Sequence, residues 1–134
     1  MADPKPEDRP SRLPTVRPER HPVVLVVGGP EELDVAALTV AQTESPTIAV
    51  KSCGASDALN IAASLRPFAI VLSHDVYGFD ADEFDAMARD VQAELVLMRV
   101  EKMAPGFLEA ALRPWIRHAF RRYRTEAESG PVRR

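Results

Sequence analysis

FAIVLSHDVYGFDADEF, residues 68–84, contains the transition that decides the fold. It opens with five apolar residues, Phe68 to Leu72, which the polar triplet Ser73-His74-Asp75 follows. A short apolar run bounded by polar and glycine residues is typical of a strand buried on both faces. Tyr77-Gly78 predicts a turn, after which a helix restarts and carries Phe84. Because open α/β sheets place functional groups at the carboxyl ends of their strands, the polar triplet is the first candidate site.

Three further segments predict strands. Val23–Val27 is an apolar run rich in β-branched residues, and Gly28-Gly29-Pro30 ends it. Thr47–Lys51 and Glu94–Val100 are the other two. Short β-branched and apolar runs between turn residues favour strands over helices.

Four helices are predicted by apolar residues at helical spacing. They cover about residues 30–42, 57–65, 82–91 and 106–126. Ser56 is expected to cap the second helix. Pro114 lies inside the last one and predicts a kink near residues 110–114, because proline lacks a backbone N–H. The faces expected to be buried are Leu33, Ala36, Ala37, Val40 and Ala41; Ala58, Leu59, Ala62 and Leu65; Phe84, Met87, Ala88 and Val91; and Leu108, Leu112, Trp115, Ile116, Ala119, Phe120 and Tyr123.

Strands and helices therefore alternate, which predicts an α/β fold: a parallel sheet with helices on both faces and right-handed crossovers. The 134 residues suffice for one domain with a proper core, which we expect to span residues 23–126. Residues 1–22 contain six prolines among charged residues and predict a disordered leader. Residues 127–134 are expected to form a flexible tail.

The bulk composition excludes several classes of protein. No apolar run approaches the roughly 18 residues that a membrane span needs, and no signal peptide is evident, so we expect a cytoplasmic protein. The single cysteine, Cys53, excludes an internal disulfide and a zinc site built from cysteines. Arginine outnumbers lysine fourteen to three, which is typical of a GC-rich bacterial genome.

Charge is distributed unevenly along the chain. Residues 23–112 carry five basic and fourteen acidic side chains, whereas residues 113–134 carry seven arginines and two glutamates. The arginines of the last helix recur on one face, and three aromatic residues lie near them. This face is either a plain solvated surface or a binding surface for an acidic protein, an anionic membrane or a nucleic acid. No DNA-reading module accompanies it, so a protein partner is expected. The residues are Arg113, Arg117, Arg121 and Arg124, with Trp115, Phe120 and Tyr123.

Three segments resemble a response-regulator receiver domain. They are VVLVVGG at residues 23–29, SDALNIAASLRPFAIVLSHDVYGFDADEF at residues 56–84, and MRVEKMAPGFLEAAL at residues 98–112. The resemblance covers about residues 23–122. It implies a three-layer flavodoxin-like fold, shortened to about four strands because about one αβ unit is missing after Val100, with a long kinked C-terminal helix.

The resemblance also implies where receiver chemistry would lie, and there the sequence departs from the pattern. The two metal-binding acids of the first strand would fall on Gly28 and Gly29, and the phosphoacceptor aspartate on His74, one residue before Asp75. The small hydroxyl residue of the fourth strand would fall on Arg99-Val100. Only Lys102 remains as a match to the family lysine. Since phosphoryl transfer requires a cation, the resemblance implies a pseudo-receiver without metal or cofactor.

Such a protein would not be an enzyme. It would act as a protein–protein interaction module in bacterial regulation or signalling, next to two-component systems, and a homodimer is compatible with this interpretation. Two alternatives remain open. One is a phosphorylatable receiver that uses Asp75; the other is a small enzyme or ligand-binding module at Ser73-His74-Asp75.

Other candidate sites have simpler explanations. His74 and Asp75 could form a metal or acid–base site with Asp80 or Asp82, but neighbouring residues of a strand point to opposite sides. Gly28-Gly29-Pro30 could hold a phosphate at a helix start, but it lacks the GxGxxG spacing and Glu31-Glu32 would repel an anion. Cys53 has no activating neighbour in the sequence, and Ser73 lacks the GxSxG motif of hydrolases.

Overall fold

The computed structural model describes residues 21–100 and 106–129, and side chains as far as residue 126. Within these ranges strands and helices alternate as the sequence predicts, with one addition, α3. Residues 1–20 of the predicted leader, Lys102, and residues 130–134 of the predicted tail lie outside the described residues. Residues 127–129, which were also assigned to the tail, continue α5. The elements are β1 (Val23–Val27), α1 (Glu31–Glu44), β2 (Ala49–Cys53), the 3₁₀ turn η2 (Ala55–Asp57), α2 (Ala58–Leu65), β3 (Ala69–Ser73), α3 (His74–Phe79), α4 (Ala81–Val91), β4 (Glu94–Met98) and α5 (Phe107–Ser129).

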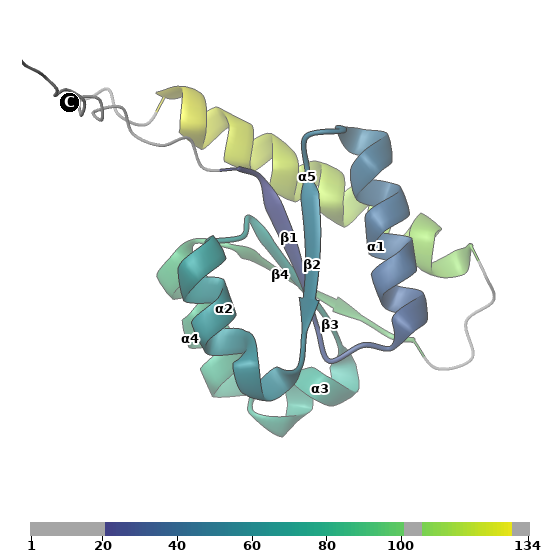
Figure 1. Cartoon of the computed structure of the whole chain (residues 1–134), viewed down its shortest axis with the longest axis vertical. Coiled ribbons are helices and arrows are strands. Elements are labelled where there is room, and N and C mark those ends of the chain that lie inside the picture. The colour runs from purple at the N-terminus through teal and green to yellow at the C-terminus, as the bar shows by residue number, and fades with distance from the viewer. Residues whose placement is uncertain (1–20, 101–105, 130–134) are drawn as a thin grey trace, which may run out of the picture.

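The four strands form one parallel sheet in the order β2-β1-β3-β4. Helices α1 and α5 cover one face, α2 and α4 cover the other, and α3 lies at the carboxyl end of the sheet (Figure 1). This is the flavodoxin-like α/β fold that was predicted, with four strands and a long C-terminal helix. Every residue of β1 and β3 is buried because both strands are central and covered on both faces, which explains their continuous apolar sequences.

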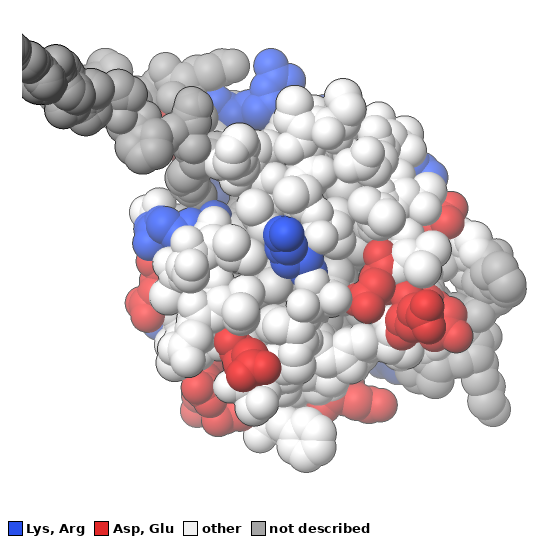
Figure 2. Space-filling view, viewed as in Figure 1, with Lys and Arg blue, Asp and Glu red and all other residues white. Residues whose placement is uncertain are grey.

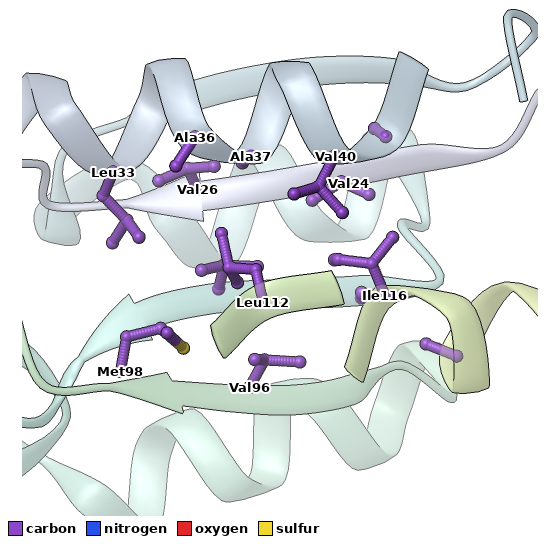
Figure 3. Close-up of a cluster of buried hydrophobic side chains, with 14 of the residues drawn as sticks. Val24, Val26, Leu33, Ala36, Ala37, Val40, Val96, Met98, Leu112 and Ile116 are labelled. Carbon is purple, nitrogen blue, oxygen red and sulfur yellow. The ribbon is translucent and has the colours of Figure 1, made fainter. Parts of the chain in front are cut away.

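The larger core lies between the sheet and the pair α1 and α5. Figure 3 shows Leu112 and Ile116 of α5 among side chains of α1 and of the sheet, including Val24 and Val96. Leu112 and Ile116 are fully buried, and burying a side chain of this size stabilises a fold by about 1.5–3 kcal/mol. The predicted buried face of α1 is confirmed at all five of its positions: Leu33, Ala36, Ala37, Val40 and Ala41.

Three aromatic rings join the C-terminal half of α5 to the start of β3. The ring of Phe68 lies 5.5 Å from that of Phe120 and 5.5 Å from that of Tyr123, measured between centroids. Phe120 and Tyr123 stack at 6.0 Å. Because Phe68 precedes β3, this half of α5 lies at the amino end of the sheet.

The second core lies under α2 and α4. The predicted buried face of α4 is confirmed, whereas α2 buries only the small residues Ala58 and Ala62. Leu59 is 47% exposed, so its predicted burial is wrong: α2 lies close to the sheet through its alanines, and Leu59 lies one residue further round the helix. Trp115 is likewise exposed, because it falls on the flank of α5 and outside the stripe that packs in the core.

Local signals account for the remaining differences. Ser56 does not cap α2, since it lies inside η2, and the residue before α2 is Asp57, which makes no side-chain cap. β2 begins two residues later than predicted because Ser45 and Thr47 form a hydroxyl-bonded turn, 2.8 Å between oxygens. α5 continues through Pro114, and its kink stays a prediction. Among the described helices, none combines the length and the hydropathy needed to cross a membrane.

Candidate functional site

The polar triplet after β3 is divided between a strand and a helix. Ser73 is the last residue of β3 and is buried, and its Oγ accepts a hydrogen bond from the backbone N–H of Val76 at 3.2 Å. It is therefore the N-cap of α3, and the chain passes from strand to helix without a loop. The predicted turn at Tyr77-Gly78 is wrong, because both residues lie within α3. A serine followed by an acid two residues later was the signal for this helix start.

His74 and Asp75 occupy the first turn of α3, and both are exposed. An acid at this place is favourable because helix N-termini are electropositive. Nearby, Asp80 is the N-cap of α4 and accepts from the N–H of Glu83 at 3.3 Å. A hydrogen bond between the two side chains, together with the charge of Asp80, raises the pKa of Glu83. No three His, Cys, Asp or Glu side chains among residues 21–100 and 106–126 are placed to hold a metal ion together.

The two glycines at the end of β1 have positive φ, 82° at Gly28 and 68° at Gly29. The Gly28 N–H donates to the carbonyl of Cys53 at 2.8 Å, which continues the ladder with β2. A Cβ on Gly28 would lie 2.8 Å from Cγ2 and 3.2 Å from Cγ1 of Val76. Real Cβ atoms do not approach so closely, and residues other than glycine rarely adopt this φ. Position 28 thus has no room for a side chain while Val76 stays in place.

The start of α1 is unsuited to an anion. Pro30 stands at the N-cap position and has no N–H to donate. Three acids, Glu31, Glu32 and Asp34, occupy the first turn. Burial and the charge of Glu31 raise the pKa of Asp34, and its Oδ1 is buried without a hydrogen-bond partner among the described residues.

The end of β4 carries no hydroxyl group. Arg99 is exposed and Val100 is half-buried against the core under α1 and α5.

Between α3 and α4, a contact that the sequence did not reveal holds the two helices together. The Tyr77 hydroxyl donates to both carboxylate oxygens of Asp85, at 3.0 and 3.2 Å. This hydrogen bond raises the pKa of Tyr77. Tyr77 and Asp85 lie on different helices, so the period of a single helix does not mark the pair.

The arginines of α5 differ in their surroundings. Arg117 pairs with Glu44 at the end of α1, 3.4 Å between Nε and Oε1. Arg121 is exposed, and the guanidinium of Arg124 lies 6.0 Å from the centre of the Phe120 ring. Arg113 is half-buried. These arginines share one side of the helix, as predicted.

The three aromatic residues do not join the arginines in one exposed patch. Phe120 is buried and Tyr123 is half-buried, and both pack on Phe68. Phe120 and Tyr123, which the sequence analysis grouped with the arginines, therefore support α5 from beneath. Trp115 is 55% exposed but lies on the other flank of α5.

That other flank follows β4. Arg122 pairs with Glu94, the first residue of β4, and with Glu126 at 3.2 Å. His118 Nε2 lies 3.8 Å from Oε2 of the same Glu94. Trp115 lies three residues before His118 and seven residues before Arg122, which is about one and two helical turns. All three residues therefore share this flank of α5.

Charge is separated in space as well as in sequence. The acids of the first turns of α1, α3 and α4 lie beyond the carboxyl ends of the strands. Figure 2 shows most acidic side chains of the visible face in its lower half, toward the end of the molecule where α3 lies. The arginines of α5 continue to the amino end of the sheet, where Phe120 and Tyr123 meet Phe68.

No protein-family model matches this chain, and no curated protein matches it either. Fold and geometry are therefore the basis for assigning a function.

Proposed function

We propose that this chain is a pseudo-receiver: a receiver-like domain that is not phosphorylated, is not an enzyme, and acts by binding another protein. We place this role in the cytoplasm, in bacterial regulation next to two-component signalling. The observation that carries the proposal is the contact between Val76 and Gly28, where a Cβ would lie 2.8 Å from a methyl carbon.

The contact matters because it leaves no room for a metal-binding side chain at position 28. A receiver transfers a phosphoryl group to aspartate only with a divalent cation that neutralises the phosphate oxygens. The resemblance places the cation ligands at positions 28 and 29, which here are glycines with positive φ. Asp75, the nearest carboxylate to the phosphoacceptor position, is exposed in a helical turn beyond the strand. The scaffold is thus retained while the groups that would bind the cation are replaced.

The arginine face of α5 is the proposed binding surface. Arg117, Arg121 and Arg124 are exposed on one side of a helix whose opposite side is anchored in the core. Guanidinium groups form paired hydrogen bonds with carboxylates, so an acidic protein surface is the partner that fits. The half-buried Arg113 extends the same row by one turn.

Two experiments test the proposal. Incubation with acetyl phosphate and Mg²⁺ should leave the intact mass unchanged; a stable phosphoprotein that Asp75→Ala abolishes would instead support the receiver alternative. In a pull-down from bacterial lysate, Arg121→Glu should lose the partner. Arg89→Glu makes the same charge change on α4, on the opposite face of the sheet, and should retain it. Equal loss in both variants would argue against α5 as the binding surface.

A further inference from the structure

The two edges of the sheet differ in chemistry. In β2, the edge strand on one side, Lys51 and Ser52 are exposed. In β4, the edge strand on the other side, four consecutive residues are apolar and either half-buried or buried: Leu95, Val96, Leu97 and Met98. An edge strand presents unpaired backbone N–H and C=O groups, and charged side chains such as lysine protect it from pairing. The β2 edge has this protection, and the centre of the β4 edge does not.

The pairing of β4 is one-sided in the part of the chain that the structure describes. β4 pairs with β3 in parallel, with Ala69 level with Glu94 and Ser73 level with Met98. No strand among residues 21–100 and 106–129 pairs with its other side. The sequence of β4 resembles that of a central strand, yet the strand lies at an edge.

We propose that β4 of a second copy of this chain pairs with this edge. The two β4 strands run antiparallel about a two-fold axis that passes through Val96 perpendicular to the sheet. Two four-stranded sheets thereby become one sheet of eight strands. The inference does not rest on the proposed function.

Register supports a second copy as the occupant. A two-fold axis through Val96 places Leu95 opposite Leu97 of the partner subunit, and Leu97 opposite the partner's Leu95. Residues directly opposite each other lie on the same face, so these four leucines form one cluster on the face of α4. An axis through Leu97 would place Arg99 opposite Leu95, and an axis through Leu95 would place Glu94 opposite Val96. The Val96 and Leu97 registers both pair only apolar residues at their three central positions. The Val96 register, which places Glu94 opposite Met98, is the one that brings the four leucines together.

The flank of α5 adds a second contact on the opposite face of the sheet. Glu94 holds Arg122 and His118, which aligns this flank with β4. Trp115 lies on the same flank and is 55% exposed. Around the proposed axis, the two α5 flanks face each other across the paired strands, so both tryptophans lose contact with water. Isologous contacts of this kind are the commonest among homo-oligomers, because one surface supplies both sides.

Analytical ultracentrifugation over a range of concentrations tests the proposal. The wild-type chain should sediment with twice the chain mass, and Leu97→Lys should sediment with the chain mass, because a lysine on an edge opposes pairing. Val50→Lys is the matched control: Val50 is also half-buried, but on β2, and the variant should remain dimeric. Circular dichroism verifies that both variants are folded. A wild type that stays monomeric up to about 1 mM, as expected if a strand of another protein is the occupant, would overturn the proposal. A dimer that Leu97→Lys leaves intact would overturn it as well.

A distance measurement tests the arrangement independently. Cys53 is the single cysteine, lies on β2, and is level with Leu97 through the register of the sheet. In the proposed dimer, seven strand spacings separate the two cysteines, which is roughly 34 Å. Spin labels attached to Cys53 at mildly alkaline pH should give this distance by pulsed electron paramagnetic resonance. A distance below about 20 Å would instead place the two β2 edges together and contradict the β4 pairing.

Discussion

Val76 of α3 occupies the space that a side chain on Gly28 would need at the end of β1. The contact depends on two separate facts, the positive φ of Gly28 and the capped junction that starts α3 directly after β3. It joins the end of β1 to α3, an α-helix that the sequence did not reveal.

Replacement of Gly28 by aspartate, the residue type that the receiver resemblance implies there, should destabilise the fold by about 2 kcal/mol, because strain at positive φ adds to the steric conflict. Urea denaturation measures the loss. The double variant Gly28→Asp with Val76→Ala should regain only the part of the stability that the steric conflict removes. Gly78→Ala is the control: a Cβ there has no atom within 4 Å among the described residues, and alanine in a helix stabilises by about 0.5–1 kcal/mol. A Gly28→Asp variant as stable as the wild type would show that Val76 moves freely.

Removal of the cap of α3 should cost about 1 kcal/mol, because Ser73→Ala leaves the N–H of Val76 without its acceptor at a buried position. Thermal unfolding followed by circular dichroism measures the change. Ser56→Ala should be nearly neutral, since the exposed Ser56 is not the N-cap of η2 or α2. If Ser73→Ala lowered the unfolding temperature no more than Ser56→Ala does, the cap would contribute nothing to stability.

Asp34→Asn should raise the unfolding temperature relative to the wild type more at pH 7 than at pH 3. Burial and Glu31 raise the pKa of Asp34 above its ordinary value of 3.8, so the folded state holds the proton more tightly than the unfolded state does. The stability that the protonated Asp34 contributes is fully present below the pKa that Asp34 has in the unfolded state. It is lost as pH rises through the pKa that Asp34 has in the folded state. Glu32→Gln, an exposed acid in the same turn, is the control. A pH-independent difference for Asp34→Asn would contradict the expectation.

Tyr77→Phe should destabilise the fold at pH 8 and have a smaller effect near pH 11. The hydrogen bond to Asp85 raises the pKa of Tyr77, so the stability it adds is present below the unfolded pKa and is lost as pH rises through the folded one. Absorbance titration reports the ionisation of the tyrosines, which are Tyr77 and Tyr123. Asp85→Asn should bring the Tyr77 pKa back toward its ordinary value, and an unchanged titration in that variant would exclude Asp85 as the cause.

Much of the fold is readable in the sequence because its central strands and two of its helices have clear apolar patterns. β1 is wholly apolar and β3 is apolar up to its last residue, Ser73, and the stripes of α1 and α4 match their buried faces residue for residue. α3 was missed because Gly78 suggests a turn, although the cap at Ser73 starts a helix four residues earlier. The burial of Leu59 and Trp115 was predicted wrongly because an apolar stripe in the sequence does not reveal how much of the helix surface the rest of the fold covers.

The candidate surfaces were harder to predict, for a topological reason. That Gly28 meets Val76 follows from two chain segments that are 48 residues apart, and no local pattern encodes their distance. Likewise, Glu94–Met98 has the composition of an interior strand. Its place at an edge follows only from the order β2-β1-β3-β4 and from α5 folding back over α1.

The separation of acids and arginines gives the molecule a permanent electric dipole, although the net charge is only −3. An approaching acidic surface is repelled at the carboxyl end of the sheet and attracted at the far end of α5, so encounters should be oriented before contact. Orientation of this kind weakens once the screening length falls to about 8 Å at physiological salt. The isoelectric point of about 5.6 describes the chain as a whole and does not reveal the arginine face of α5. Association rates with an acidic partner should fall steeply as salt is added.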